Sequence, residues 1–287
     1  MTAKTIVITG ASCGIGAAAA KQLNAAGHEV IVVGRNPAKT KAVAEALGVA
    51  SYLCDFERLT DVRRLAAALL RDYPRIDALF NNAGAWFDSF ELTADGFERT
   101  IQVNHLAPAL LTDLLRPAFS KGAVLVWTSS MAARWCGRFD PARIGVSDDA
   151  ARAEFGTFKA YGASKLAASV YVGEFDRRYR DAGIFSVSIH PGTVATSFGA
   201  NTDTLAGRLM RTRLAQAVLT SPVTAARKLT LFLDCDPEEV WTPGAYYQGR
   251  MPKLRRKVDN PLLGAEVWDR TWECLTPLFS GAAAGAG

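Results

Sequence analysis

The sequence predicts an α/β fold, with one domain in which a doubly wound parallel sheet of about seven strands carries helices on both faces. Short apolar segments alternate with longer helical patterns along the chain, which indicates repeated βαβ units. These segments are apolar nearly throughout, as in sheets that are covered on both faces. A glycine-rich turn directly follows the first segment and opens a helix. With 287 residues, 49% of them hydrophobic, the chain can bury one large core.

Apolar and often β-branched segments define the strands of the predicted sheet. Six of them can be placed, at residues 5–9, 30–33, 51–54, 76–81, 123–128 and 185–190. Helical patterns lie between them, at residues 17–26, 37–47, 59–72, 97–119 and 160–180. We expect one domain over residues 1–279.

Three segments depart from this alternation. Residues 131–158 are long and mixed in composition, and residues 280–287 contain only Gly, Ala and Ser, so the latter are predicted to be a disordered tail. Residues 199–221 combine flexible positions with apolar residues at helical spacing, which predicts a mobile substrate loop or lid. A permanently docked helix is the alternative for this segment.

Composition narrows the class of protein. The sequence contains no run of 18 apolar residues and no recognisable secretion signal, so we expect a cytoplasmic protein without a membrane span. Five cysteines and three histidines lack disulfide or metal-ligand spacing, which argues against a metal site. The net charge of +5 is modest, and the basic run at 253–257 is interpreted as a solvated loop rather than a nucleic-acid contact. Homo-oligomerisation stays open.

The strongest motif is the glycine-rich turn at residues 9–16, TGASCGIG. Its glycines let the backbone approach a pyrophosphate, and the helix that follows offers free N–H groups and the positive end of its dipole. Four further motifs follow in order: NNAG at 81–84, Ser130 after the fifth strand, YGASK at 161–165, and Pro-Gly at 191–192. This ordered set resembles the short-chain dehydrogenases/reductases, which have a Rossmann-type sheet.

The resemblance implies a catalytic group of Ser130, Tyr161, Lys165 and Asn104. Tyr161 and Lys165 are four residues apart on one predicted helix, so their side chains point the same way. The ammonium of Lys165 is expected to lower the pKa of Tyr161, which acts as acid and base on an alcohol or carbonyl. Ser130 would hold the substrate oxygen. Asn104 would link Lys165 to a water chain, as the resemblance implies.

The end of the second strand indicates the cofactor. NAD-binding sites place an acidic residue about 20 positions after the glycines, to bind the ribose 2′-hydroxyl. This sequence has Arg35 and Asn36 there, and an arginine can pair with a 2′-phosphate, so NADP(H) is predicted. Cys13 departs from the basic or polar residue of many relatives, and packing is its favoured role over redox sensing. The predicted cofactor-binding residues are Gly10, Ser12, Cys13, Gly14, Ile15, Gly16, Arg35, Asn36, Asp55, Phe56, Asn82, Ala83, Gly84, Tyr161, Lys165, Pro191, Gly192, Val194 and Thr196.

The substrate is predicted to be a small molecule with a carbonyl or alcohol, bulky and apolar or aromatic. Ser130 and Tyr161 are 31 positions apart, a long gap that resembles the retinol dehydrogenase and protochlorophyllide reductase subgroup. Apolar side chains near the motifs are predicted to line its pocket: Trp86, Met131, Trp135 and Phe198. Reduction of a conjugated carbon–carbon double bond and a non-catalytic NADP(H) sensor are the alternatives.

Overall fold

A computed structural model describes residues 2–192, 220–234, 237–249, 251–253 and 255–280. Eight strands form a single sheet, in the order β3-β2-β1-β4-β5-β6-β7-β8. The first seven are parallel to their neighbours, and β8 is antiparallel to β7. The strand bounds are β1 Thr5–Thr9, β2 Glu29–Gly34, β3 Ala50–Leu53, β4 Ile76–Asn81, β5 Phe119–Thr128, β6 Ile184–His190, β7 Tyr246–Gln248 and β8 Met251–Lys253. The α/β prediction is confirmed.

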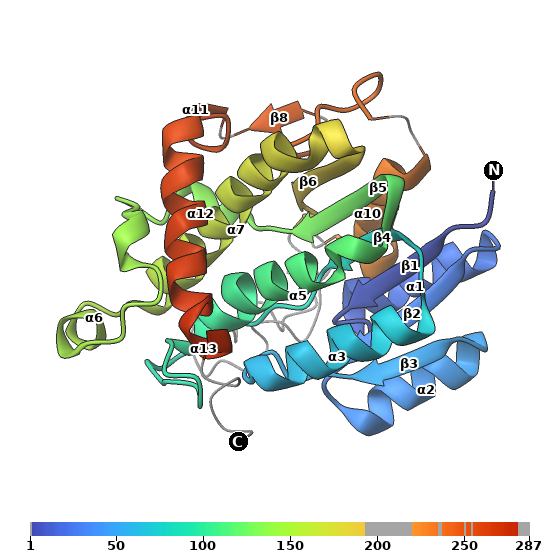
Figure 1. Cartoon of the computed structure of the whole chain (residues 1–287), viewed down its shortest axis with the longest axis horizontal. Helices are drawn as coiled ribbons and strands as arrows, with labels where there is room; N and C mark the ends of the chain where they lie inside the picture. Colours follow the sequence, from blue (N-terminus) through green and yellow to red (C-terminus); the bar gives the residue numbers. More distant parts are fainter. Residues whose placement is uncertain (1, 193–219, 235–236, 250, 254, 281–287) are drawn as a thin grey trace.

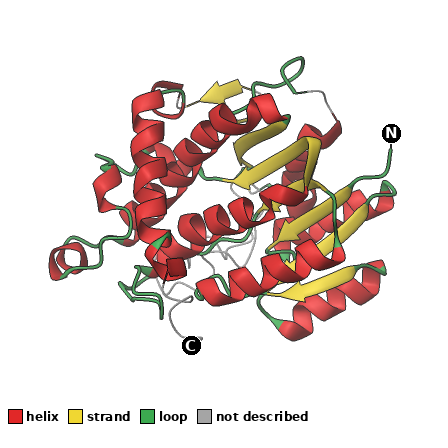
Figure 2. Cartoon of the chain, in the orientation of Figure 1, coloured by secondary structure: helices red, strands yellow, loops and turns green. Residues whose placement is uncertain are grey.

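Helices cover both faces of the sheet, which lies between them in Figure 2. One buried apolar cluster packs α3, α5, α7 and α12 against one face, and a second packs α1, α2 and α10 against the other. In Figure 1, α12 lies across α7. The helix bounds are α1 Gly14–Ala25, α2 Pro37–Leu47, α3 Leu59–Asp72, α4 Arg99–Ile101, α5 Ala107–Leu115, α6 Asp149–Ala153, α7 Thr157–Tyr179, α10 Pro222–Asp234, α11 Arg255–Val258, α12 Pro261–Leu275 and α13 Pro277–Ser280.

The strand order reverses between β1 and β4. From β1 the chain proceeds outward to β2 and β3, and it then returns to β4 on the other side of β1. Ligands of open α/β sheets bind outside the carboxyl ends of the strands at such a reversal. The predicted motifs after β1 and β4 therefore face each other at this place.

The helical stretch predicted over residues 97–119 is helical from Arg99 to Ala118, but it is not one continuous α-helix. The segment is divided into α4, a π-helical turn at Gln102–Leu106, α5 and a short 3₁₀ turn, and β5 already begins at Phe119. Pro108 lies four residues after Asn104 and has no N–H to donate to its carbonyl, so an α-helical hydrogen bond cannot form there. The turn widens at this place, and π-helical turns are frequent at functional sites.

Two smaller expectations also change. The basic run at 253–257 is not a loop, because β8 ends at Lys253 and α11 begins at Arg255. Ser280 ends α13 rather than beginning a tail, and residues 281–287 lie outside the described residues. Of the predicted lid at 199–221, only Thr220 and Ser221 are described, so the lid stays a prediction. No helix of the described ranges has the length and apolar character needed to cross a membrane.

Candidate active site

The predicted site residues gather at one edge of the sheet. Because β1 to β6 are parallel, the turns that follow them all lie at the carboxyl edge. The glycine turn follows β1, NNAG ends and follows β4, Ser130 follows β5, and Pro191 and Gly192 follow β6. Arg35 and Asp55 follow β2 and β3 at the same edge. The structure therefore brings together the described members of the predicted site.

The glycine turn is packed so closely that side chains would not fit. Gly10 has a φ of +66°, and a Cβ there would lie 2.8 Å from the Cα of Ala83. A Cβ on Gly16 would lie 2.5 Å from the carbonyl oxygen of Gly10. The turn opens α1, where Cys13 is the N-cap residue and makes no side-chain cap hydrogen bond. A bare backbone before an uncapped helix N-terminus fits the pyrophosphate of a dinucleotide.

Thr9 joins the two turns and was not among the predicted site residues. Its Oγ1 accepts hydrogen bonds from the backbone N–H groups of Asn82 and Ala83, at 3.1 and 3.0 Å. The side chain of Asn82 donates in return to the carbonyl of Thr9 at 3.0 Å and accepts from the Thr128 hydroxyl. The threonine that opens the TGASCGIG motif was the available signal for this role.

Tyr161 and Lys165 lie one turn apart on α7, and both are buried. Tyr161 is 7% exposed and Lys165 is 3% exposed. The Nζ atom of Lys165 donates to the carbonyl of Thr128 at 2.9 Å and lies 5.9 Å from the centre of the Tyr161 ring. Ser130 hydrogen-bonds with the Tyr161 side chain. Three of the four predicted catalytic side chains are thus assembled around the end of β5.

Burial sets the protonation of this pair. It raises the pKa of Tyr161 to about 12, although the hydrogen bond with Ser130 acts in the opposite direction. Burial also lowers the pKa of Lys165 to about 8. Lys165 is not among the causes of this shift, so burial dominates the Tyr161 pKa in this structure, and its lowering by Lys165 stays a prediction. At neutral pH Tyr161 holds its proton and Lys165 is charged.

Asn104, the fourth predicted catalytic residue, lies in the π-helical turn and fixes the loop after β4. Its Oδ1 accepts from the N–H of Ala85 at 2.8 Å, and its Nδ2 donates to the carbonyl of Ala85 and to the Ser164 hydroxyl. A Cβ on Gly84 would lie 2.9 Å from the Nζ of Lys165 and 3.0 Å from the Oδ1 of Asn104. Gly84 thus lets this loop, Asn104 and Lys165 meet. The water chain that Asn104 would link to Lys165 stays a prediction.

Tyr246 supports Ser130 from β7, a role that the sequence did not indicate. Its hydroxyl donates to the Ser130 carbonyl at 3.1 Å. The Oγ of Ser130 accepts from the N–H of Ala132, which makes Ser130 the N-cap of the short 3₁₀ turn Met131–Arg134. The serine is held by its backbone from one side and by the turn it caps from the other.

Aromatic side chains lie close to Tyr161. The rings of Trp86 and Tyr161 are 4.8 Å apart at an angle of 35°, and the ring of Phe158 is 6.0 Å from that of Trp86. Phe158 was missed, although its position three residues before Tyr161 on a helix predicts the same face. Trp135 is 58% exposed, and the sulfur of Met131 accepts from the Gln248 side chain at 3.2 Å. Trp86 is therefore the predicted pocket residue with the clearest contact to the site.

The part of the site after β2 and β3, where an adenosine is predicted to bind, is called the adenosine end. It is more exposed and more highly charged. Arg35 is 62% exposed in its side chain, and its Nη1 lies 2.7 Å from Glu57 Oε1 and 3.9 Å from Asp55 Oδ1. Asn36 caps α2 by accepting from the N–H of Lys39, so its side chain serves the helix. The side chain of Phe56 lies in the core, and the predicted adenine contact of Asp55 and Phe56 stays a prediction.

Other predicted positions are placed as follows. Ser12 packs near Gly34, and Ile15 is partly buried against the core. Cys13 is exposed, so the packing role expected for its thiol is wrong. Gly192 follows Pro191 with a φ of +112°. Three predicted residues lie outside the described part of the chain: Val194, Thr196 and Phe198.

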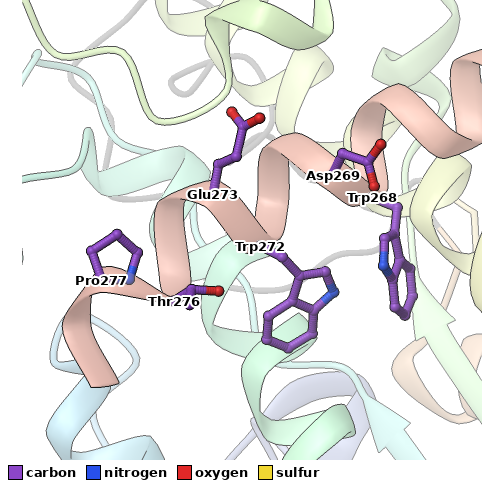
Figure 3. A pocket seen from close by; sticks show the side chains of 6 residues that line it. All are labelled: Trp268, Asp269, Trp272, Glu273, Thr276 and Pro277. Atoms are coloured by element: carbon purple, nitrogen blue, oxygen red, sulfur yellow. The ribbon is translucent and has the colours of Figure 1, made fainter. Parts of the chain in front are cut away.

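A separate surface hollow of about 490 Å³ lies along α12. It is lined by Trp268, Asp269, Trp272, Glu273, Thr276 and Pro277, as Figure 3 shows. None of these six residues belongs to the predicted site. The hollow is therefore not part of the predicted site.

Comparisons with known proteins place this fold and site. A family model described as short chain dehydrogenase matches residues 4–138. A protein provisionally assigned as a daunorubicin C-13 ketoreductase, from Streptomyces sp. (strain C5), is 36% identical over 272 residues, covering 93% of this chain and 90% of its own. Human retinol dehydrogenase 13 is 31% identical over 284 residues, covering 94% and 82%. A short chain dehydrogenase from Burkholderia cenocepacia J2315, solved in complex with NADP, has a TM-score of 0.63 and 26% identity, covering 82% and 91%.

The fold and the site define the chain as an oxidoreductase with a Rossmann-type sheet. More specifically, it belongs to the short-chain dehydrogenase/reductase family, as its motifs predicted. The resemblance to the retinol dehydrogenase-like subgroup is likewise supported by its relatives.

Proposed function

We propose that this chain reduces a carbonyl group to an alcohol with NADP(H) as cofactor and Tyr161 as the acid. The observation that carries the proposal is the placement of Tyr161. It is buried one helical turn from Lys165 and hydrogen-bonded with Ser130, and a phenol is protonated at neutral pH. Reduction requires a proton donor at the substrate oxygen, and this is the form in which Tyr161 is held.

Each residue of the site has a part in this reaction. When bound, the nicotinamide supplies the hydride. The Ser130 hydroxyl orients the carbonyl oxygen, and Tyr161 donates its proton to the alkoxide as it forms. Lys165 would hold the nicotinamide ribose and, as a cation, stabilise the tyrosinate left behind. Asn104 and Gly84 fix the loop that carries Trp86.

The residues of the nucleotide end fit NADP(H). The closely packed glycine turn would hold the pyrophosphate, Asp55 the adenine and Arg35 the 2′-phosphate. NADP in the complex of the Burkholderia relative supports this choice. The remaining predicted cofactor contacts, including those beyond Gly192, are part of the same proposal.

The substrate class we propose is a bulky ketone or aldehyde with an aromatic or extended apolar body. Trp86 places an aromatic ring directly beside Tyr161, and the Phe158 ring packs against Trp86, so that such a body would meet aromatic surface there. The names of the relatives support a carbonyl or alcohol substrate, since one is named for the C-13 ketone of daunorubicin and another for retinol.

A carbonyl panel tests the proposal. The purified chain is mixed with NADPH and with polycyclic ketones, retinal-like aldehydes, small aliphatic ketones and conjugated alkenones, and the loss of NADPH absorbance is followed. We expect alcohol products, with the large aromatic carbonyls reduced fastest. Saturated ketone products would show reduction of the double bond instead. Tight NADPH binding without turnover of any compound would favour a sensor.

A further inference from the structure

Arg35, the proposed ligand of the 2′-phosphate, is engaged by an acidic residue of this chain. Its Nη1 donates to Glu57 Oε1 at 2.7 Å, across 22 positions of sequence. Asp55 lies within ion-pair distance of the same nitrogen. A phosphate that approaches Arg35 would therefore meet two carboxylates around it.

Glu57 does not depend on Arg35 to be neutralised. Arg99 donates to both of its carboxylate oxygens, at 2.9 and 3.2 Å. Arg99 is held in turn by Glu91 and by the Phe87 ring, whose centre lies 4.1 Å from its guanidinium carbon. Glu57 is thus fixed in place, whereas Arg35 is the exposed member that can leave.

We propose that Glu57 determines cofactor specificity by competing with the 2′-phosphate for Arg35, and so limits the preference for NADPH over NADH. The inference rests on the proposed role of Arg35. Arg35 faces two carboxylates, and that of Glu57 makes the shorter contact and is itself fixed by Arg99. To pair with Arg35, the phosphate has to displace the fixed carboxylate of Glu57 from the guanidinium, and that exchange costs part of the binding free energy. NADH has no such phosphate and is unaffected.

Binding titrations of Glu57→Gln test the proposal without turnover. Affinities for NADPH and NADH are measured by cofactor fluorescence, and those for 2′,5′-ADP and 5′-AMP by calorimetry. We expect NADPH and 2′,5′-ADP to bind roughly three- to fivefold more tightly, which is the size of an exposed ion pair that no longer has to be broken. NADH and 5′-AMP should bind as in the wild type.

Glu91→Gln is the matched control. It removes the same charge from a partner of Arg99 but has no contact with Arg35. We expect less than half of the gain seen for Glu57→Gln. An equal gain in both variants would reduce the effect to general charge and overturn a specific competition. If Glu57→Gln fails to fold, Glu57→Asp takes its place. It keeps the charge on a shorter side chain that is drawn back from Arg35, so NADPH should still bind more tightly than to the wild type.

Arg35→Ala separates the two proposals. It should bring the affinity for NADPH down to that for NADH, and Glu57→Gln should add no gain in this background. If Arg35→Ala leaves NADPH binding unchanged, the role of Arg35 fails and this inference with it. If Arg35→Ala weakens NADPH but Glu57→Gln alone gives no gain or a loss, only the inference fails, since Glu57 would then position Arg35.

Discussion

The reaction end of the site and its adenosine end are built from different interactions. Around Tyr161 and Lys165 the groups are buried and meet through short hydrogen bonds to the backbone of neighbouring turns. Around Arg35 the side chains are exposed and held by ion pairs among themselves. Removal of one partner from a buried hydrogen bond costs the full desolvation free energy of the other, whereas exposed ion pairs contribute little to stability and weaken in salt.

This difference separates the two tasks of the enzyme. Chemistry is assigned to the part of the molecule where water is excluded and the pKa values of Tyr161 and Lys165 are shifted. We propose that the choice of cofactor depends on the adenosine end, where one substitution alters the exposed ion pairs of Arg35. We therefore expect large, salt-independent effects at the reaction end and small, salt-dependent effects at the adenosine end.

The largest effect is expected for Tyr161→Phe. Loss of the proton donor should lower kcat by roughly 10²- to 10⁴-fold, while NADPH binding stays within about twofold of the wild type. Stopped-flow turnover and a fluorescence titration measure the two quantities. Tyr52→Phe is the control. It removes the same oxygen atom from a tyrosine of β3, whose hydroxyl donates to Asp72 at the end of α3. Tyr161→Phe with most of its turnover would remove Tyr161 from the mechanism.

The next effect concerns pH and Lys165. Burial lowers the pKa of Lys165 to about 8, so the ammonium is charged below that pH and neutral above it. Because the cation attracts an anionic cofactor and donates to its ribose, NADPH affinity should fall several-fold as the pH rises through about 8. Titrations from pH 6.5 to 9.5 measure this. Lys165→Met should bind more weakly throughout and show no change near pH 8, and persistence of the change would assign it to another group.

A smaller effect is expected for Trp86→Ala. Removal of the ring beside Tyr161 should raise KM for a bulky aromatic ketone roughly two- to tenfold, the size of one aromatic contact, and leave small aliphatic ketones unchanged. Steady-state kinetics with one substrate of each kind measure the difference. Phe90→Ala is the control from the same loop, since the Phe90 ring packs against Phe155. Equal changes for both substrates would mean that Trp86 supports the site and does not bind the substrate body.

The smallest effect is that of salt. Raising the ionic strength from about 0.01 to 0.5 M shortens the screening length from roughly 30 Å to a few Å. The ratio of NADPH to NADH affinity should then fall by roughly threefold, while kcat at saturating cofactor stays constant. A ratio that does not respond to salt would contradict the contrast between the two ends.

Much of this architecture follows from local sequence, and the rest from long-range contacts. The strand 76–81 and the helices 37–47 and 59–72 have the predicted bounds, because strand periodicity and start signals such as Pro37 act locally. The division of residues 97–119 was also local, since Pro108 shows where an α-helical hydrogen bond is missing.

The electrostatics of the site were harder to predict. The Tyr161 pKa depends on burial by the whole fold, which the spacing of Tyr161 and Lys165 does not reveal. The contact of Arg35 with Glu57 joins residues that follow different strands, and no motif marks Glu57. The motifs thus predicted which proposed catalytic residues lie together, whereas their charge states and partners could not be predicted.

The two edges of the sheet affect how the protein meets its own copies. An open edge offers unpaired N–H and C=O groups, on which a strand of another molecule can add and begin an aggregate. β8 ends the sheet with only three residues, and Pro252 at their centre has no N–H to donate. β3, at the other edge, has four residues. Extension of the sheet from one molecule to the next is therefore unfavourable.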